Sequence, residues 1–134
     1  MRNVDDVRVL ERAHLLALSA YRVSRELPRV EMFGLRSQME RAAVSVAANI
    51  AEGLGRGTQG DVERFLRIAA GSAVEMAALI RIADELYPIE GQIIDSVREH
   101  LDAVRRMLTR FVVTVREGRR RPSVSEGRLR PSVE

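Results

Sequence analysis

The chain has 134 residues, the size of a single domain, and 46% of them are hydrophobic while only 4% are aromatic. The absence of cysteine excludes disulfide bonds and thiolate metal sites, and the shortage of aromatic residues argues against a β-sandwich. The formal net charge is +3 and all 22 basic residues are arginines, an excess too small to indicate a nucleic-acid-binding protein by itself.

The N-terminal segment is expected to form a helix over residues 5–27. Asn3, with Asp6 three residues later, is an N-cap pattern, and Pro28 disfavours any continuation of the helix. One buried face is indicated by apolar residues at heptad spacing: Val9, Ala13, Leu16, Ala20, Val23 and Leu27. The charged N-terminus contains no apolar signal-peptide core, and no apolar run is long enough to span a membrane, so we expect a cytoplasmic protein.

A second helix is expected over residues 34–54 and carries two parallel lines of side chains. The apolar line consists of Met39, Ala43, Val46, Ile50 and Leu54. Beside it runs a polar row at steps of three and four: Gln38, Arg41, Ser45, Asn49, Glu52 and Arg56. Glycines at positions 53, 55, 57 and 60 indicate a turn after this helix.

A third helix is expected over residues 58–87, opened by Thr58 with Asp61 three residues later and ended by Tyr87-Pro88. Its buried line is Val62, Leu66, Ala69, Ala73, Met76, Ile80, Ala83 and Tyr87. A second line widens the apolar face enough for two neighbours: Phe65, Ile68, Ser72, Glu75, Leu79, Ile82 and Leu86. A fourth helix, over residues 90–116, follows from Val97, Leu101, Val104, Leu108, Phe111 and Val115.

The four helices predict one all-α domain over residues 1–117. Short connections between long helices favour antiparallel neighbours, so we expect an antiparallel up-down-up-down four-helix bundle. Residues 118–134 are expected to form a disordered arginine-rich tail, in which EGRRRPSV and EGRLRPSV repeat with a period of nine. The tail holds five arginines and two acidic residues, whereas 17 arginines balance 17 acidic residues elsewhere, so the net charge of +3 lies in the tail.

The polar row of the second helix predicts a network with the third helix. Antiparallel pairing about a turn near Gly57 places Arg41 level with Glu75, and Ser45 near Ser72. We expect a structural polar network that sets helix alignment, with an Arg41–Glu75 ion pair at its centre: Arg41, Ser45, Asn49, Ser72 and Glu75. A recognition surface is the alternative interpretation of the same row.

Several short motifs stand out along these segments: Glu31-x-Phe33-Gly34-Leu35, SQ, RAAVS, ANIAEG, Arg56, FLRIA-x-GS and Glu75. They resemble the motifs of a known family, the four-helix-bundle proteins encoded in intervening sequences of 23S ribosomal RNA genes. The resemblance covers residues 6–117. It implies a left-handed bundle, assembly into a pentamer and no established catalysis. The family is similar in fold to pentameric accessory proteins of diversity-generating retroelements, which contact nucleic acid.

The second helix also carries many small residues, which let another backbone approach closely: Ala42, Ala43, Ala47, Ala48 and Ala51. Either the bundle core is tight there, or this face meets another subunit. Apolar surface on several sides of each helix favours the second interpretation. We therefore expect a non-enzymatic homo-oligomer, with a pentamer as the expected assembly, that serves as an accessory factor on RNA or DNA. The candidate phosphate contacts are Arg36, Arg56, Arg64, Arg67, Arg98, Arg105, Arg106 and Arg110, with Arg119, Arg120 and Arg121 in the tail. The alternative is a protein–protein interaction scaffold without a nucleic-acid role.

No catalytic, cofactor or metal site is predicted. Glu11-x-x-His14 is half of a di-iron motif, but His100 lacks the glutamate three residues earlier that a second half would need. The glycine-rich turn lacks the Lys-Ser/Thr ending of a phosphate loop and follows a helix instead of a strand. No arrangement of nucleophile and base is evident.

Overall fold

The computed structural model describes residues 4–118, and these residues form helices without any strand. The predicted all-α class is confirmed. The elements are α1 (Val4–Arg25), the short 3₁₀ helix η1 (Arg29–Glu31), α2 (Leu35–Leu54), α3 (Gln59–Leu86) and α4 (Gly91–Arg116). The expectations for Arg119 and the rest of the tail lie outside the described residues.

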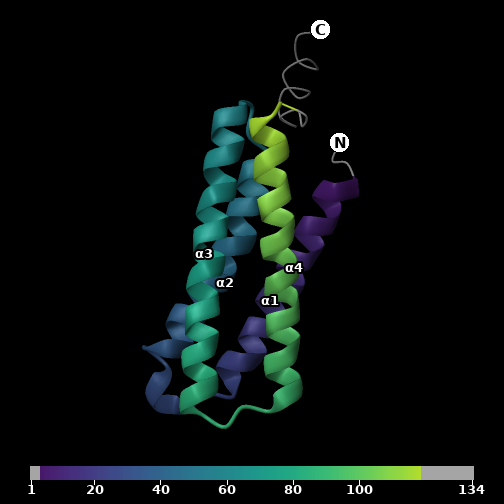
Figure 1. Ribbon diagram of the computed structural model, residues 1–134. Helices are drawn as coiled ribbons and strands as arrows, with labels where there is room; N and C mark the ends of the chain where they lie inside the picture. Colours follow the sequence, from purple (N-terminus) through teal and green to yellow (C-terminus); the bar gives the residue numbers. More distant parts are fainter. Residues whose placement is uncertain (1–3, 119–134) are drawn as a thin grey trace, which may run out of the picture.

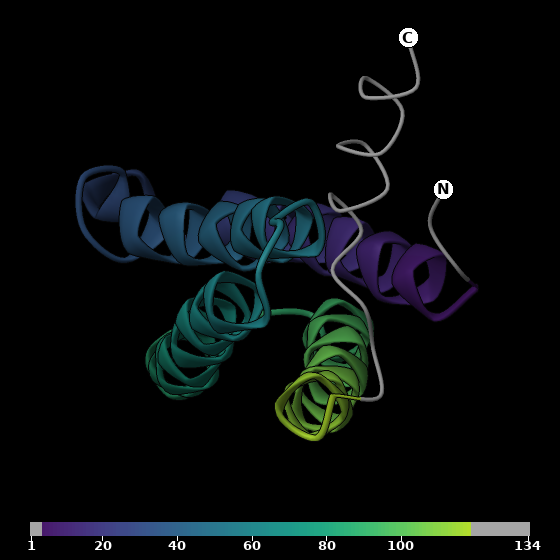
Figure 2. The ribbon, with the colours of Figure 1, turned by 90° about the horizontal axis from the view of Figure 1, so that it is seen from above.

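The four long helices form two layers, with α1 beside α2 and α3 beside α4 (Figures 1 and 2). Each helix packs against its neighbours in the chain, and α1 also packs against α4. Interhelical contacts show that α3 and α4 are antiparallel: Arg98 meets Asp84 near one end and Arg116 meets Glu63 near the other. The first turns of α1 extend away from the other helices, and Val4 and Val7 are exposed there (Figure 1).

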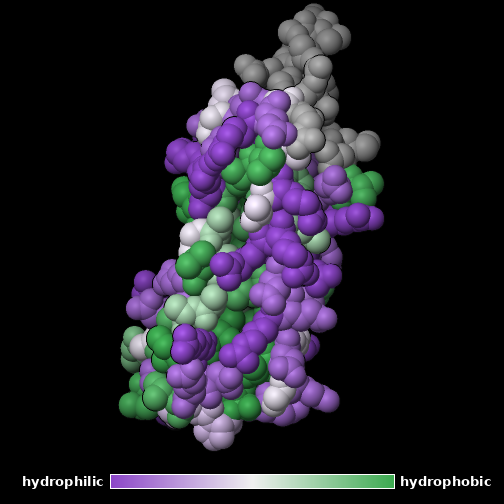
Figure 3. All heavy atoms as spheres, in the orientation of Figure 1, coloured by the Kyte–Doolittle hydropathy of each residue, from purple (hydrophilic) through white to green (hydrophobic). Residues whose placement is uncertain are grey.

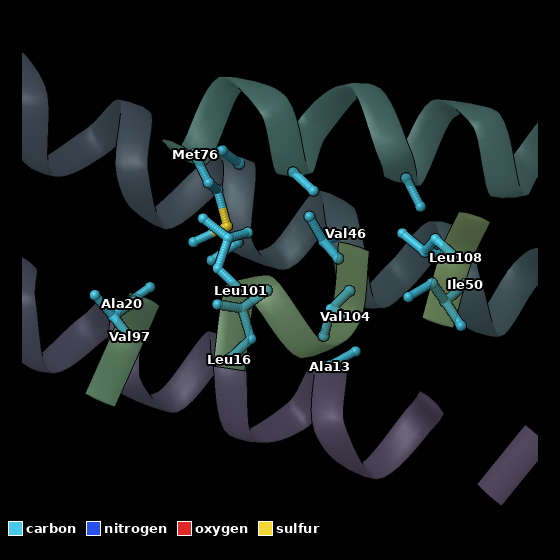
Figure 4. Close-up of a cluster of buried hydrophobic side chains, with 14 of the residues drawn as sticks. Ala13, Leu16, Ala20, Val46, Ile50, Met76, Val97, Leu101, Val104 and Leu108 are labelled. Carbon is cyan, nitrogen blue, oxygen red and sulfur yellow. The ribbon is translucent and has the colours of Figure 1, made fainter. Parts of the chain in front are cut away.

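The core is made by the predicted apolar seams of all four helices. Figure 4 shows its layers between α1 and α4, where Ala20 lies beside Val97 and Leu16 beside Leu101. Apart from the half-buried Tyr87, every residue of the four seams is buried. Burying a Val, Leu, Ile or Met side chain stabilises by about 1.5–3 kcal/mol, so these seams supply most of the driving force for folding.

The second apolar line of α3 lies at the edge of the core. Ile68, Ile82 and Leu86 are exposed, and Phe65 and Leu79 are half-buried. The α3 helix therefore leaves part of its apolar surface beside α2 uncovered in the single chain.

Local hydrogen bonds explain where the helices begin and end. The Thr58 hydroxyl accepts the Asp61 N–H at 3.2 Å, which is the predicted cap of α3. At the end of α1, the Glu26 and Leu27 N–H groups bond the carbonyls three residues earlier, so the last turn tightens before Pro28. After that proline the chain forms η1, which the sequence pattern does not predict because a single 3₁₀ turn has no periodicity.

Close contact between α2 and α3 depends on Gly53. A Cβ atom at Gly53 would lie 2.9 Å from the Cβ of Phe65 and 3.4 Å from the carbonyl oxygen of Val62. Both neighbouring atoms are close to the backbone and cannot move aside without moving the helix. The first turn of α3 therefore approaches the last turn of α2 to a distance that only glycine allows.

Candidate functional site

A compact polar cluster joins α2 to α3 at the middle of the bundle. The Ser45 and Ser72 hydroxyls lie 2.8 Å apart. The side-chain amide of Asn49 donates to the carbonyl oxygen of Ser45 at 2.8 Å and to its hydroxyl at 3.1 Å. All three side chains are half-buried. This part of the expected network is present in the structure.

The prediction of an ion pair between Arg41 and Glu75 at the centre of that network is wrong. Arg41 and Glu75 are both exposed, and no ion pair within 4.0 Å joins them in the described chain. The helix period explains the difference. Arg41 lies four residues from Ser45, so its side chain is rotated about 40° around the axis of α2 relative to that of Ser45. Glu75 lies three residues from Ser72, so its side chain is rotated about 60° around the axis of α3. Both rotations turn the charged side chains away from the core.

A second cluster, which the sequence pattern does not reveal, surrounds Glu31 just before the start of α2. One carboxylate oxygen of Glu31 accepts the Leu35 N–H at 3.0 Å, and the other accepts the Tyr87 hydroxyl. The bond from Tyr87, followed by the bond from Leu35, lowers the pKa of Glu31 below its ordinary value. The same contact with Glu31 raises the pKa of Tyr87. Glu31 thus ties the start of α2 to the α3–α4 connection.

The candidate arginines divide into two groups, and the first is held by neighbouring side chains. Arg56 meets Glu52 at 2.8 Å and Asp61 at 3.9 Å. Arg67 pairs with Glu63 at 2.7 Å, and Arg98 pairs with Asp84 at 3.0 Å. Two guanidinium groups also make cation–π contacts with the Phe65 ring. That of Arg64 lies 4.5 Å from the ring centre and that of Arg56 lies 5.1 Å from it.

The second group has no acidic partner within 4.0 Å among residues 4–118, and consists of Arg36, Arg105, Arg106 and Arg110. Three of these are exposed on α4, along which hydrophilic side chains gather in Figure 3. A shallow surface hollow of about 300 Å³ is lined by Asp102, Arg105, Arg106 and Thr109. The Thr109 hydroxyl donates to the carbonyl oxygen of Arg105 at 3.0 Å, and the guanidinium groups of Arg105 and Arg106 have no acidic partner within 4.0 Å among residues 4–118.

Comparison with protein families decides the relationship suggested by the sequence motifs. A family model described as 23S rRNA-intervening sequence protein matches residues 5–110. The chain belongs to this family. No curated protein matches the chain. The family description names no reaction and no bound ligand.

In this member of the 23S rRNA-intervening sequence protein family, the matched residues include both polar clusters and the α4 arginines up to Arg110. Arg119, Arg120 and Arg121 lie beyond the match and outside the described residues. None of the described helices combines the length and apolar character of a membrane span.

The two histidines of this family member lie on α1 and α4. His14 is exposed on α1, whereas His100 of α4 faces α1, where its Nδ1 lies 3.4 Å from a guanidinium nitrogen of Arg12. Burial, followed by the charge of Arg12, lowers the pKa of His100. Within residues 4–118, no three His, Asp or Glu side chains come together in a group that could hold a metal ion.

Proposed function

We propose that this chain is a non-enzymatic, homo-oligomeric accessory protein that contacts RNA or DNA phosphates through α4. The observation that carries the proposal is the group formed by Arg105, Arg106 and Arg110, which are exposed and lack an acidic partner in the described chain. Residues 103–116 contain four arginines and no acidic residue. Arg116 is paired with Glu63 of α3, whereas the positive charges of Arg105, Arg106 and Arg110 have no acidic side chain within 4.0 Å in the described chain. Positive charge of this kind is what phosphate binding requires.

The geometry of these arginines suits phosphate better than a structural role. Arg105 and Arg106 line the hollow on α4 together with Thr109, and each guanidinium offers several donors in a planar fork. Asp102 also lines the hollow, and its carboxylate weakens the attraction of the two arginines for an anion. The charges are exposed, so their contribution to binding depends on the release of counterions and on salt.

Self-association is the second part of the proposal. Several helices carry exposed apolar side chains: Val7, Leu18, Val44, Ile68, Val74, Ile82 and Leu86. Exposed apolar surface commonly marks contacts between proteins. Family membership favours the same assembly, with five copies as the expected number. An oligomer would repeat the α4 arginines around its surface and so multiply the number of phosphate contacts.

A salt titration with matched variants tests the nucleic-acid contact. Replacing Arg105, Arg106 and Arg110 by glutamine should weaken binding to short RNA or DNA and reduce the dependence of log affinity on log salt concentration by about 0.7–0.9 per lost contact. The control is a triple glutamine variant of Arg67, Arg81 and Arg98, which removes the same charge from arginines that are held in ion pairs. Equal losses in both variants would contradict a specific role for the α4 group.

The alternative function is a protein-interaction scaffold without a nucleic-acid role. The exposed apolar residues of α3 favour it, because they are available to any protein partner. Absence of RNA and DNA binding at about 50 mM salt, where phosphate contacts are strongest, would leave this alternative in place.

A further inference from the structure

The segment formed by η1 and the residues that lead from it into α2 carries the most exposed of the large apolar side chains recorded for the described residues. Phe33 is 92% exposed and Val30 is 83% exposed, and Met32 beside them is also exposed. We call these three residues the apolar tip. Figure 3 shows hydrophobic side chains gathered at the lower left corner, over η1 and the start of α2, and Figure 1 shows this segment beside the lower end of α3. An aromatic ring in this setting gains nothing from the core.

The backbone that carries the apolar tip is held on both sides. Within the turn, the Glu31 N–H donates to the Pro28 carbonyl at 2.9 Å and the Gly34 N–H donates to the Glu31 carbonyl at 3.0 Å. The Glu31 carboxylate accepts the Leu35 N–H and the Tyr87 hydroxyl, as described above. Phe33 is therefore exposed on a turn whose backbone is held by hydrogen bonds, and not on a frayed chain end. The position of the turn is fixed, and the ring is accessible to a ligand there.

Positive charge flanks the apolar tip. Arg29 precedes Phe33 by four residues and Arg36 follows it by three, and neither has an acidic partner within 4.0 Å in the described chain. Four extended residues span at most about 14 Å, so both guanidinium groups stay within reach of one or two nucleotides whose base lies on the ring. Of the nearby acidic residues, Glu31 is occupied by its two donors and Glu40 accepts the Ser24 hydroxyl at 2.6 Å.

We propose that the apolar tip is a binding site for single-stranded nucleic acid, in which one unpaired base stacks on Phe33 while Arg29 and Arg36 contact the adjoining phosphates. An exposed aromatic ring combined with basic side chains is the recurring chemistry of single-strand binding, and it tolerates any base because every base has a π-face. A duplex cannot use this site, because its bases are already stacked on each other. The site deepens the proposed function and rests on it, since it names the strand form that the α4 arginines accompany.

The chain contains no tryptophan, which allows a direct test. In the full-length variant Phe33→Trp, the introduced indole is the single tryptophan, and stacking of a base should quench its fluorescence. The probe is an oligonucleotide of about 12 unmodified nucleotides, used once as a single strand and once annealed to its complement. We expect saturable quenching by the single strand, and no quenching by the duplex at concentrations where the α4 arginines bind it.

Substitutions at the apolar tip give the second measurement, by fluorescence anisotropy of the labelled oligonucleotides. Phe33→Ala should weaken single-strand binding at least about fivefold and leave duplex binding unchanged, whereas Phe33→Trp should retain single-strand binding. Because Phe33 is 92% exposed, circular dichroism and the melting temperature should stay unchanged in both variants. Tyr87→Phe, which removes one anchor of Glu31 but keeps the ring at 33, should weaken single-strand binding less than Phe33→Ala.

The outcomes separate this site from the proposed function. If neither strand form binds at about 50 mM salt, the proposed function fails and this site fails with it. If both forms bind and Phe33→Ala changes neither, the α4 contact stands and the apolar tip is not a base-binding site. Binding of the wild type, but not of Phe33→Ala, to vesicles of phosphatidylserine and phosphatidylcholine, without an effect on the single strand, would overturn the proposal in favour of a membrane surface. Conversion of an oligomer to a monomer by Phe33→Ala would overturn it in favour of a subunit contact.

Discussion

Ser45 and Ser72 form the central polar contact between α2 and α3, and Arg41 on the same row has no such contact. Ser45→Ala removes a partner from both the Ser72 hydroxyl and the half-buried Asn49 amide, so we expect a loss of about 1–3 kcal/mol in the free energy of unfolding. Arg41→Ala should cost less than about 1 kcal/mol, because its charge is already in water. Urea unfolding of the two variants makes the comparison. A larger loss for Arg41→Ala would mean that its guanidinium has a partner in solution.

His100 makes stability depend on pH in a defined direction. Its Nδ1 accepts a hydrogen bond from Arg12 only while the ring is neutral, and its pKa lies below the ordinary value of 6.5. As the pH falls through about 6.5, the unfolded chain takes up this proton before the folded one, so stability should decline as the pH is lowered from about 7.5 through 6.5 and until the folded chain is protonated as well. His100→Gln should remove this part of the decline and the control His14→Gln, at an exposed position, should keep it. Urea unfolding at several pH values measures both.

At the scale of the helices, the two glycines Gly53 and Gly71 form a matched pair. Gly53→Ala would place a methyl group 2.9 Å from the Cβ of Phe65, so α2 and α3 must separate, and we expect a loss of about 1–3 kcal/mol. Gly71 lies in α3, is exposed, and has open space around its missing Cβ. Gly71→Ala should stabilise the protein by about 0.5–1 kcal/mol through helix propensity. Thermal unfolding of both variants tests the prediction. Changes of opposite sign in the melting temperature would support it, and equal changes would contradict it.

The helices were predictable because each one repeats its apolar residues at a helical period, and their seams are buried as expected. The pairing of Ser45 with Ser72 was predictable from the same register, since both hydroxyls lie close to the helix contact. The Arg41–Glu75 pair was not, because level position along two helices says nothing about how far each side chain is rotated outward. Glu31 escaped detection because it lies in the short turn before α2, where no period exists to show that its carboxylate meets Leu35 and Tyr87.

For the whole molecule, the arrangement of the exposed surface argues for self-association through the outer face of α2 and α3. Val44 on α2 and Ile68 and Ile82 on α3 are each between 42% and 48% exposed, and α2 adds the exposed small residues Ala48 and Ala51. Small side chains there let a second copy approach closely, and covering this face removes apolar surface from water. The wild-type protein should therefore have a solution mass several times the 15.0 kDa of one chain.

Charged substitutions locate the contact. Ile68→Glu places a carboxylate on the α2–α3 face and should lower the mass measured by light scattering toward that of one chain, because a buried, unpaired charge opposes association. Ile68 is 42% exposed, so the helical circular dichroism of the variant should be preserved. Val113→Glu is the matched control, since Val113 is 39% exposed but lies on α4 among the arginines, and its mass should equal that of the wild type. A wild-type protein that sediments as a single chain at micromolar concentration would contradict the assembly, and dissociation by Val113→Glu alone would move the contact to α4.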